Sequence, residues 1–127
     1  MIRVLGSLAL ILAFATGTAS GAEAPFNATT FQKLLSDGKP VAVDFHADWC
    51  PVCRAQEPVL RSIIAEPEFH DLTILVANFG SETALRKSLN ASRQSTLVVF
   101  GHGKEVARST GDTSEARLTN LLRAALH

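Results

Sequence analysis

The most informative stretch of this chain reads Val41-Ala42-Val43-Asp44-Phe45-His46-Ala47-Asp48-Trp49-Cys50-Pro51-Val52-Cys53. Its first five residues are rich in β-branched and aromatic side chains, which predicts a short buried strand. Proline suits the first position of a helix, where its missing amide hydrogen costs nothing, so a helix is expected to begin at Pro51. The sequence therefore places Cys50 and Cys53 at the start of a helix that closely follows a buried strand.

The rest of the chain alternates between helical and strand-like patterns of apolar residues. Strands are predicted at 41–45, 72–77, 96–100 and 105–108, and helices after Thr30, from Pro51 to before Pro67, over 82–89 and after Asp112. Further local predictions are a turn at Gly101-His102-Gly103, helix caps at Ser81 and Asp112, and a kink at Pro58. Strands that alternate with helices imply a parallel part, and the last two strands imply an antiparallel hairpin. The expected fold is α/β, with a central mixed sheet of four to five strands and helices on both faces.

The composition limits the classes of protein to which the chain can belong. Its 127 residues are too few for two ordinary domains, and a hydrophobic share of 46% is too high for a disordered chain. The 12 Lys and Arg balance the 12 Asp and Glu, so the basic excess that nucleic-acid binding requires is missing. Two cysteines are too few for a disulfide-stapled mini-protein or a four-thiolate zinc site. We expect one small domain that acts as a monomer and binds no nucleic acid.

The first 22 residues have the pattern of a secretory signal peptide. Arg3 is their only charge, residues 4–15 are mostly apolar and residues 16–22 are small. The alternative is an uncleaved membrane anchor, but the strongly apolar part has about 12 residues, whereas a spanning helix needs ~20. We therefore expect export, with the periplasm as the compartment.

The expected cleavage after Ala22 defines a leader of residues 1–22 and a single domain of residues 23–127, whose net charge is −1. Cleavage after Ala19 or Ser20 also satisfies the pattern. In an oxidising compartment two thiols tend to form a disulfide. A bridge between cysteines only three residues apart closes a tiny loop and stabilises little, so redox chemistry or metal binding explains the pair better.

The start of a helix favours thiolate chemistry at Cys50. The unpaired amides of the first turn and the positive end of the helix dipole stabilise a negative sulfur there. The spacing brings Cys53 next to Cys50, one helical turn later. Cys50 can then attack a substrate disulfide, and Cys53 can resolve the mixed disulfide that forms.

Over nearly the whole of residues 23–127, the sequence resembles the thioredoxin family. The resemblance rests on Val43-Asp44-Phe45, on Ala47-Asp48-Trp49-Cys50 and Cys53-Arg54, on Pro58 five residues after the second cysteine, and on Gly103 and Gly111 around a late hairpin. Glu57 adds a similarity to the secreted thioredoxin domains of membrane-linked disulfide reductases. The family implies a thiol–disulfide oxidoreductase whose redox group is the cysteine pair itself, with no other cofactor.

The resemblance also implies roles for individual residues. Cys50 is the expected nucleophile, and Cys53 is the buried resolving thiol. Asp44 is the expected buried carboxylate below the pair, where burial would raise its pKa and suit it to accept the proton of Cys53. Trp49 and Pro51 are expected to contact the substrate, and Trp49 to shield one side of the site.

One position departs from the family. Its members usually have a cis-proline opposite the cysteine pair, directly before a threonine, and this chain has Ser95 before Thr96. A cis bond without proline costs ~2.5–4 kcal/mol, so the Gln94–Ser95 bond is expected to be trans. Ser95 and Thr96 are assigned to substrate binding because the family presents this loop to a bound peptide.

Two other classes of function stay open. A copper or zinc module, or a metallochaperone, could use Cys50, Cys53 and His46, although His46 is expected to line the thiol site rather than bind metal. A redox-inactive interaction domain could also keep the fold. The preferred hypothesis is a periplasmic thiol–disulfide oxidoreductase that reduces proteins or relays electrons. Its expected partners are protein disulfides or dithiols and a membrane-bound electron donor or acceptor.

Overall fold

A computed structural model describes residue 17 and residues 19–127 of the chain. Most of the predicted leader, including its charged and apolar parts, lies outside the described residues. Within the described part, no helix is both long and apolar enough to cross a membrane.

The core of the fold is a five-stranded mixed sheet with the strand order β1-β3-β2-β4-β5. The strands are β1 (Ala22–Pro25), β2 (Val41–His46), β3 (Thr73–Asn78), β4 (Thr96–Gly101) and β5 (Lys104–Thr110). Strands β1, β3 and β2 run parallel to one another. Strand β4 pairs antiparallel with β2, and β5 pairs antiparallel with β4. The mixed sheet confirms the predicted fold class. Strand β1 was not predicted, and its first residue is Ala22, which the sequence had placed in the leader.

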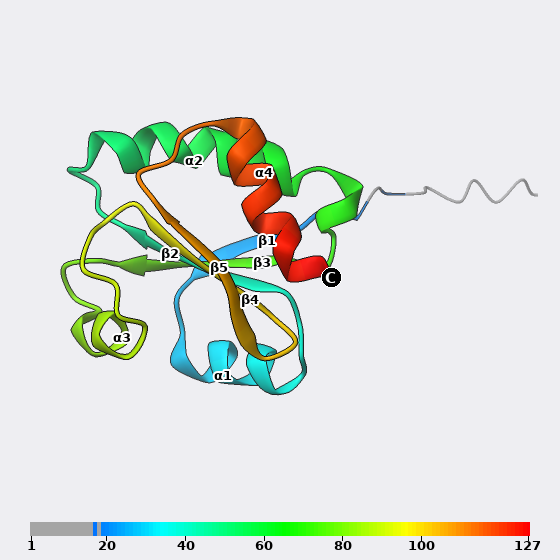
Figure 1. The fold of residues 1–127 in the computed structure, drawn as a ribbon, viewed down its shortest axis with the longest axis horizontal. Helices are drawn as coiled ribbons and strands as arrows, with labels where there is room; N and C mark the ends of the chain where they lie inside the picture. The colour runs from blue at the N-terminus through cyan, green and yellow to red at the C-terminus, as the bar shows by residue number, and fades with distance from the viewer. Residues whose placement is uncertain (1–16, 18) are drawn as a thin grey trace, which may run out of the picture.

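Helices cover both faces of the sheet, as predicted. They are α1 (Ala28–Ser36), α2 (Pro51–Ile64), α3 (Thr83–Ser88) and α4 (Glu115–Arg123), with short 3-10 turns at Pro67–Phe69 and Ala124–Leu126. Figure 1 shows α2 and α4 together on one face and α1 and α3 on the other. The sheet therefore separates two apolar cores, one under each pair of helices.

The alternation of side chains along β2 decides which face each residue serves. Val41, Val43 and Phe45 are buried in the core under α1 and α3, whereas Ala42 belongs to the core under α2 and α4. Successive residues of a strand point to opposite faces, so Asp44 shares the face of Ala42 and lies toward α2. The only charged residue of this buried strand therefore points to the helix that carries the cysteines.

The structure corrects two predicted helix caps. Helix α4 is capped by Ser114, whose side chain accepts a hydrogen bond from the amide of Arg117, rather than by Asp112. Asp112 instead accepts from the amide of Ser114 and pairs with Arg117. The N-cap residue of helix α3 is Glu82, which makes no side-chain capping hydrogen bond, so Ser81 is not the predicted cap. Both errors are of one or two residues, the scale on which local cap patterns are ambiguous.

The predicted turn between the last two strands is confirmed. His102 and Gly103 connect β4 to β5 with φ angles of 53° and 79°. Two successive positive φ angles define the hairpin turn whose twist matches that of the flanking strands, and glycine adopts one of them without strain.

Candidate active site

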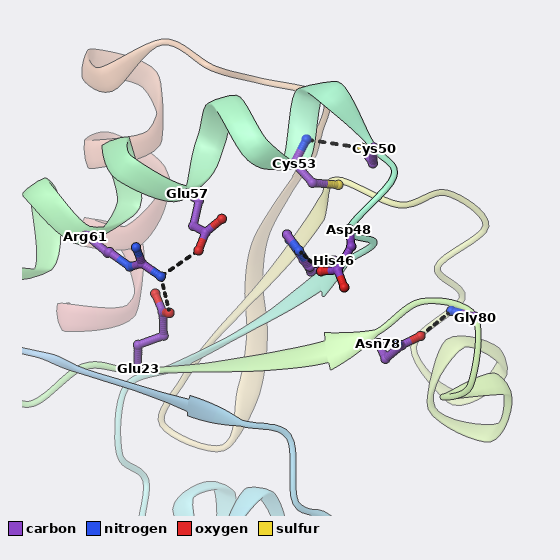
Figure 2. A network of polar contacts seen from close by, with 9 residues as sticks. All are labelled: Glu23, His46, Asp48, Cys50, Cys53, Glu57, Arg61, Asn78 and Gly80. Atoms are coloured by element: carbon purple, nitrogen blue, oxygen red, sulfur yellow. Dashed lines mark hydrogen bonds and ion pairs between the residues drawn. The ribbon is translucent and has the colours of Figure 1, made fainter.

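The cysteine pair lies where the chain passes from β2 into α2. Cys50 is the N-cap of the helix, and its Sγ accepts a hydrogen bond of 3.1 Å from the amide of Cys53. Pro51 occupies the first turn, as predicted. Figure 2 shows both cysteines at this end of the helix, and both are free thiols that are 2% exposed.

The resolving thiol is held in its protonated form. Burial raises the pKa of Cys53 to about 11, and the hydrogen bond with Cys50 and the negative charges of Cys50 and Asp44 act in the same direction. Cys53 is therefore protonated at neutral pH and cannot attack a disulfide until a base removes its proton.

The predicted carboxylate is buried near enough to Cys53 for its charge to act on that thiol. Asp44 is 7% exposed, and among the described residues no hydrogen-bond donor reaches its Oδ1. Burial raises the pKa of Asp44 to about 6; His46 opposes the change, and Glu23 and Glu57 add to it. Above pH 6 most of the carboxyl groups are ionised, so Asp44 can accept a proton under neutral conditions.

Exposed apolar side chains surround the buried thiols. Trp49 is 68% exposed and Val52 is 37% exposed, while Pro51 between the cysteines also faces solvent. An exposed aromatic ring beside a reactive centre can bury itself against a bound protein. The assignment of Trp49 and Pro51 to substrate contact stays a prediction, and their exposure is compatible with it.

The loop before β4 does not expose the two side chains that were expected to contact substrate. Ser95 and Thr96 are both buried, and the described chain contains no cis peptide bond, so the Gln94–Ser95 bond is trans, as predicted. The amide of Ser95 donates to the carbonyl of Phe45, and its carbonyl accepts from the amide of Gly111. The Thr96 hydroxyl donates to the carbonyl of Arg93 and also meets the hydroxyl of Thr110. Their polar groups are engaged inside the protein, so substrate contact by Ser95 and Thr96 stays a prediction that would need the loop to move.

Gln56 is a component of this region that the sequence analysis missed. It is 1% exposed, and its side-chain amide donates to the carbonyls of Ser95, at 3.3 Å, and Asp112, at 2.7 Å. It thereby joins α2 to the loops before β4 and after β5. The available signal was its place on the buried face of α2, three residues after Cys53 and four before Leu60, where a polar side chain needs partners.

The structure also shows how His46 is placed. Its Nε2 lies 3.0 Å from Oδ1 of Asp48, and it lines a small cavity beside Asp44. Among the residues that the structure describes, no three His, Cys, Asp or Glu side chains form a group suited to hold a metal ion. The expectation that His46 lines the site thus agrees with its position, and the metal-binding alternative stays untested.

Comparisons with known proteins agree on one relationship. The profile of the family described as Thioredoxin matches residues 23–124. A thioredoxin of Chlamydia pneumoniae is 35% identical over 92 residues, which cover 72% of this chain and 87% of that one. A thioredoxin of Mycobacterium tuberculosis strain H37Rv is 34% identical over 85 residues, covering 67% and 72%.

Solved structures give the same result. The crystal structure of Trxlp from Edwardsiella tarda EIB202 superposes with a TM-score of 0.76 at 40% identity and covers 80% of this chain and 97% of its own. A thioredoxin from Halobacterium salinarum, 24% identical, has a TM-score of 0.71 and shares the fold over 90% of this chain and 97% of its own.

Proposed function

The chain belongs to the thioredoxin family of thiol–disulfide oxidoreductases, with Cys50 and Cys53 as its redox pair, and on this premise we propose that it reduces protein disulfides in the periplasm. The leader-like residues 1–22 support export. The dipeptide between the cysteines, Pro51-Val52, contains no histidine that would stabilise the thiolate and favour oxidation. The dipeptide therefore supports a reductant rather than an oxidant of client proteins.

The reaction transfers two electrons from the cysteine pair to the substrate. The thiolate of Cys50 attacks one substrate sulfur, the substrate disulfide breaks, and the other substrate sulfur leaves as a thiolate that takes up a proton. Cys53 then loses its proton to Asp44, and its thiolate attacks Sγ of Cys50. The mixed disulfide breaks, the second substrate thiol is released, and the pair is left as a Cys50–Cys53 disulfide.

The observation that carries this proposal is the protonation state of two buried groups, Cys53 and Asp44, at neutral pH. Burial raises the pKa of Cys53 to about 11, so its thiol keeps its proton at neutral pH. Burial raises the pKa of Asp44 only to about 6, so its carboxylate can take that proton. The two pKa values support a mechanism in which Asp44 is the base that activates the resolving thiol.

A reductant that works in an oxidising compartment has to be reduced again after each turnover. Its disulfide therefore needs a source of two electrons, and a membrane-bound dithiol donor can carry them across from the cytoplasm. The exposed Trp49 and Val52 offer such a donor the same apolar surface that clients would contact.

Reduction of insulin disulfides tests the activity. Cys50→Ser is expected to abolish turnover, whereas Cys53→Ser should accumulate the mixed disulfide, because it lacks the resolving thiol. Circular dichroism of both variants checks that they are folded. Unchanged turnover in Cys50→Ser would refute the proposal.

The reduction potential tests the direction of the reaction. It can be followed by the fluorescence of Trp49, the only tryptophan, which lies next to the disulfide that forms. A potential of about −270 mV is expected for a reductant, and one of about −120 mV would identify an oxidant instead.

The alternative function, a Cu or Zn module, makes a different prediction. The reduced protein would bind Cu(I) or Zn(II) stoichiometrically, His46→Ala would lose this binding, and the protein would show no disulfide exchange.

A further inference from the structure

A small cavity lies against Asp44 on the side of the sheet that faces α2. It has a volume of about 50 Å³, and its lining residues are Glu23, Asp44, His46, Glu57, Leu60 and Val76. A space of this size with several polar walls can hold a water molecule. The unpartnered Oδ1 of Asp44 is a buried acceptor that such a water would satisfy. Neither cysteine lines this cavity, so it is a space beside Asp44 that is separate from the two thiols.

A three-residue ionic bridge borders the same cavity. Nη2 of Arg61 lies 2.6 Å from Oε1 of Glu57, one turn earlier on α2, and 3.6 Å from Oε1 of Glu23 on β1. Figure 2 shows the Arg61 guanidinium between the two carboxylates, with Glu57 coming from the helix and Glu23 from the strand beneath it. We call Glu23, Arg61 and Glu57 the acidic bridge.

The acidic bridge reaches solvent, whereas Asp44 does not. The side chains of Glu23, Glu57 and Arg61 are 27%, 39% and 59% exposed. The bridge and the cavity behind it are therefore a short connection between a buried carboxyl group and bulk water.

The elements packed around Asp44 place charges of both signs near it. On β2, His46 favours the ionised carboxylate of Asp44; on β1, Glu23 disfavours it, and on α2 Glu57 does so too. Strand β3 contributes only the apolar Val76 to the cavity. Arg61 is the cation held against both glutamates, so it offsets part of their effect.

We propose that the acidic bridge is the outlet through which Asp44 exchanges its proton with solvent, and that the bridge's net charge sets the pH at which Asp44 releases it. The proton that leaves Cys53 moves to Asp44, then to water in the cavity and out past Glu23; no electrons move in these steps. Glu23 and Arg61 are positioning residues that act through Asp44. The inference rests on the proposed function for its role in turnover, since Asp44 is the base of the resolving step.

The direct test is the titration of the Asp44 carboxyl carbon by ¹³C NMR in the reduced protein, which needs no activity. Glu23→Gln removes a negative charge and is expected to lower the titration midpoint by about 0.5 pH unit, the effect of a partly solvated charge nearby. Arg61→Met removes the compensating cation and should raise the midpoint by a similar amount. The double variant should fall between the two single variants.

Matched controls separate this effect from a general loss of structure. Arg61→Lys keeps the charge and should leave the midpoint within about 0.2 pH unit of the wild type. Glu68→Gln and Arg123→Met disrupt an ion pair of the same kind, 2.7 Å long, that lies away from Asp44, and should leave it unchanged. Midpoints equal to the wild type in Glu23→Gln and Arg61→Met, or shifts in the same direction, would overturn the proposal.

The consequence for turnover is measured separately. The rate at which Cys53 resolves a preformed mixed disulfide should depend on pH with a midpoint that moves with the Asp44 titration in each variant. A rate profile that stays fixed while the titration moves would overturn the role as an outlet. If the wild type fails to reduce insulin, the proposed function fails, but the NMR titration still decides whether the acidic bridge controls Asp44.

Discussion

The amide of Cys53 donates a 3.1 Å hydrogen bond to Sγ of Cys50. The sulfur that is expected to attack the substrate is therefore also the cap of helix α2, and it satisfies an amide that the helix leaves without an internal partner. Amides at this end of a helix favour a negative cap atom, so helix geometry and nucleophile chemistry depend on the same contact.

The double role of Cys50 predicts different results for two replacements. Serine is a good N-cap, so Cys50→Ser should stay near wild-type stability in the reduced state, whereas Cys50→Ala should be less stable than Cys50→Ser by about 1 kcal/mol. Both should lack insulin-reducing activity. Urea unfolding under reducing conditions measures the difference, and equal stability of the two variants would contradict the capping role.

The buried Asp44 makes stability depend on pH. Its pKa rises from 3.8 to about 6 on folding. The stability that protonated Asp44 contributes is complete below pH 4 and is lost as pH rises through 6, an effect of at most about 3 kcal/mol. Asp44→Asn should remove this dependence, so that it is more stable than the wild type at pH 7.5 by about 1–3 kcal/mol.

The same variant should resolve mixed disulfides at least tenfold more slowly, because the amide cannot accept the proton of Cys53. Urea unfolding at pH 4 and 7.5, with single-turnover kinetics, measures both effects. Glu68→Gln is the control for a carboxylate outside the site. A wild-type pH dependence of stability in Asp44→Asn would show that another group is responsible.

Gln56 should be important for stability although it takes no part in the chemistry. Gln56→Ala removes two hydrogen bonds, to the carbonyls of Ser95 and Asp112, and leaves a space in a buried site. We expect a loss of about 2–4 kcal/mol in the free energy of unfolding. Gln32→Ala, at an exposed position of α1, is the matched control and should change stability by less than about 0.5 kcal/mol. A similar loss in both variants would contradict the assignment.

The conformation of Ser95 predicts which replacements its loop accepts. Its φ is 60°, and its amide donates to the carbonyl of Phe45. Proline fixes φ near −65° and has no amide hydrogen, so Ser95→Pro should destabilise the protein by more than about 2 kcal/mol. Glycine adopts positive φ without strain, so Ser95→Gly should keep or slightly raise stability. Thermal unfolding compares the two, and equal melting temperatures would contradict the reading of this loop.

The start of the fold predicts where the proposed leader is cleaved. The amide of Gly21 donates to the carbonyl of Ile64, at 2.7 Å, and the amide of Ala22 to that of Leu72, at 2.9 Å. Cleavage after Ala22, the site that the sequence pattern favours, would remove both bonds and the first residue of β1. For the proposed export we therefore expect the alternative cleavage after Ala19 or Ser20, which keeps them. The intact mass of the exported protein measures the new N-terminus. A mature chain that begins at Glu23 would contradict this prediction.

Much of the fold could be predicted because its signals are local. Four strands and four helices follow from apolar periodicity and from glycine and proline at their ends, features that backbone geometry imposes within a few residues. Strand β1 was missed because its four residues, of which none is fully buried, show no alternation. The caps at Ser114 and Glu82 were misplaced by one or two residues, because several neighbouring polar residues can fill the same position.

The sequence by itself determined the position of the cysteine pair: one cysteine at a helix start that follows a buried strand, and a second thiol one turn later. Spacing within one strand and one helix suffices for this, since the period of each fixes where its side chains point. The part expected of Asp44 came from the resemblance to the family. Only the tertiary structure decided what surrounds these residues. Glu23 reaches the cavity at Asp44 because β1 lies beside β3 and β3 beside β2. Gln56 meets Ser95, 39 residues away. Such contacts depend on strand order and register, which are set by how the whole chain buries its apolar surface rather than by any local pattern.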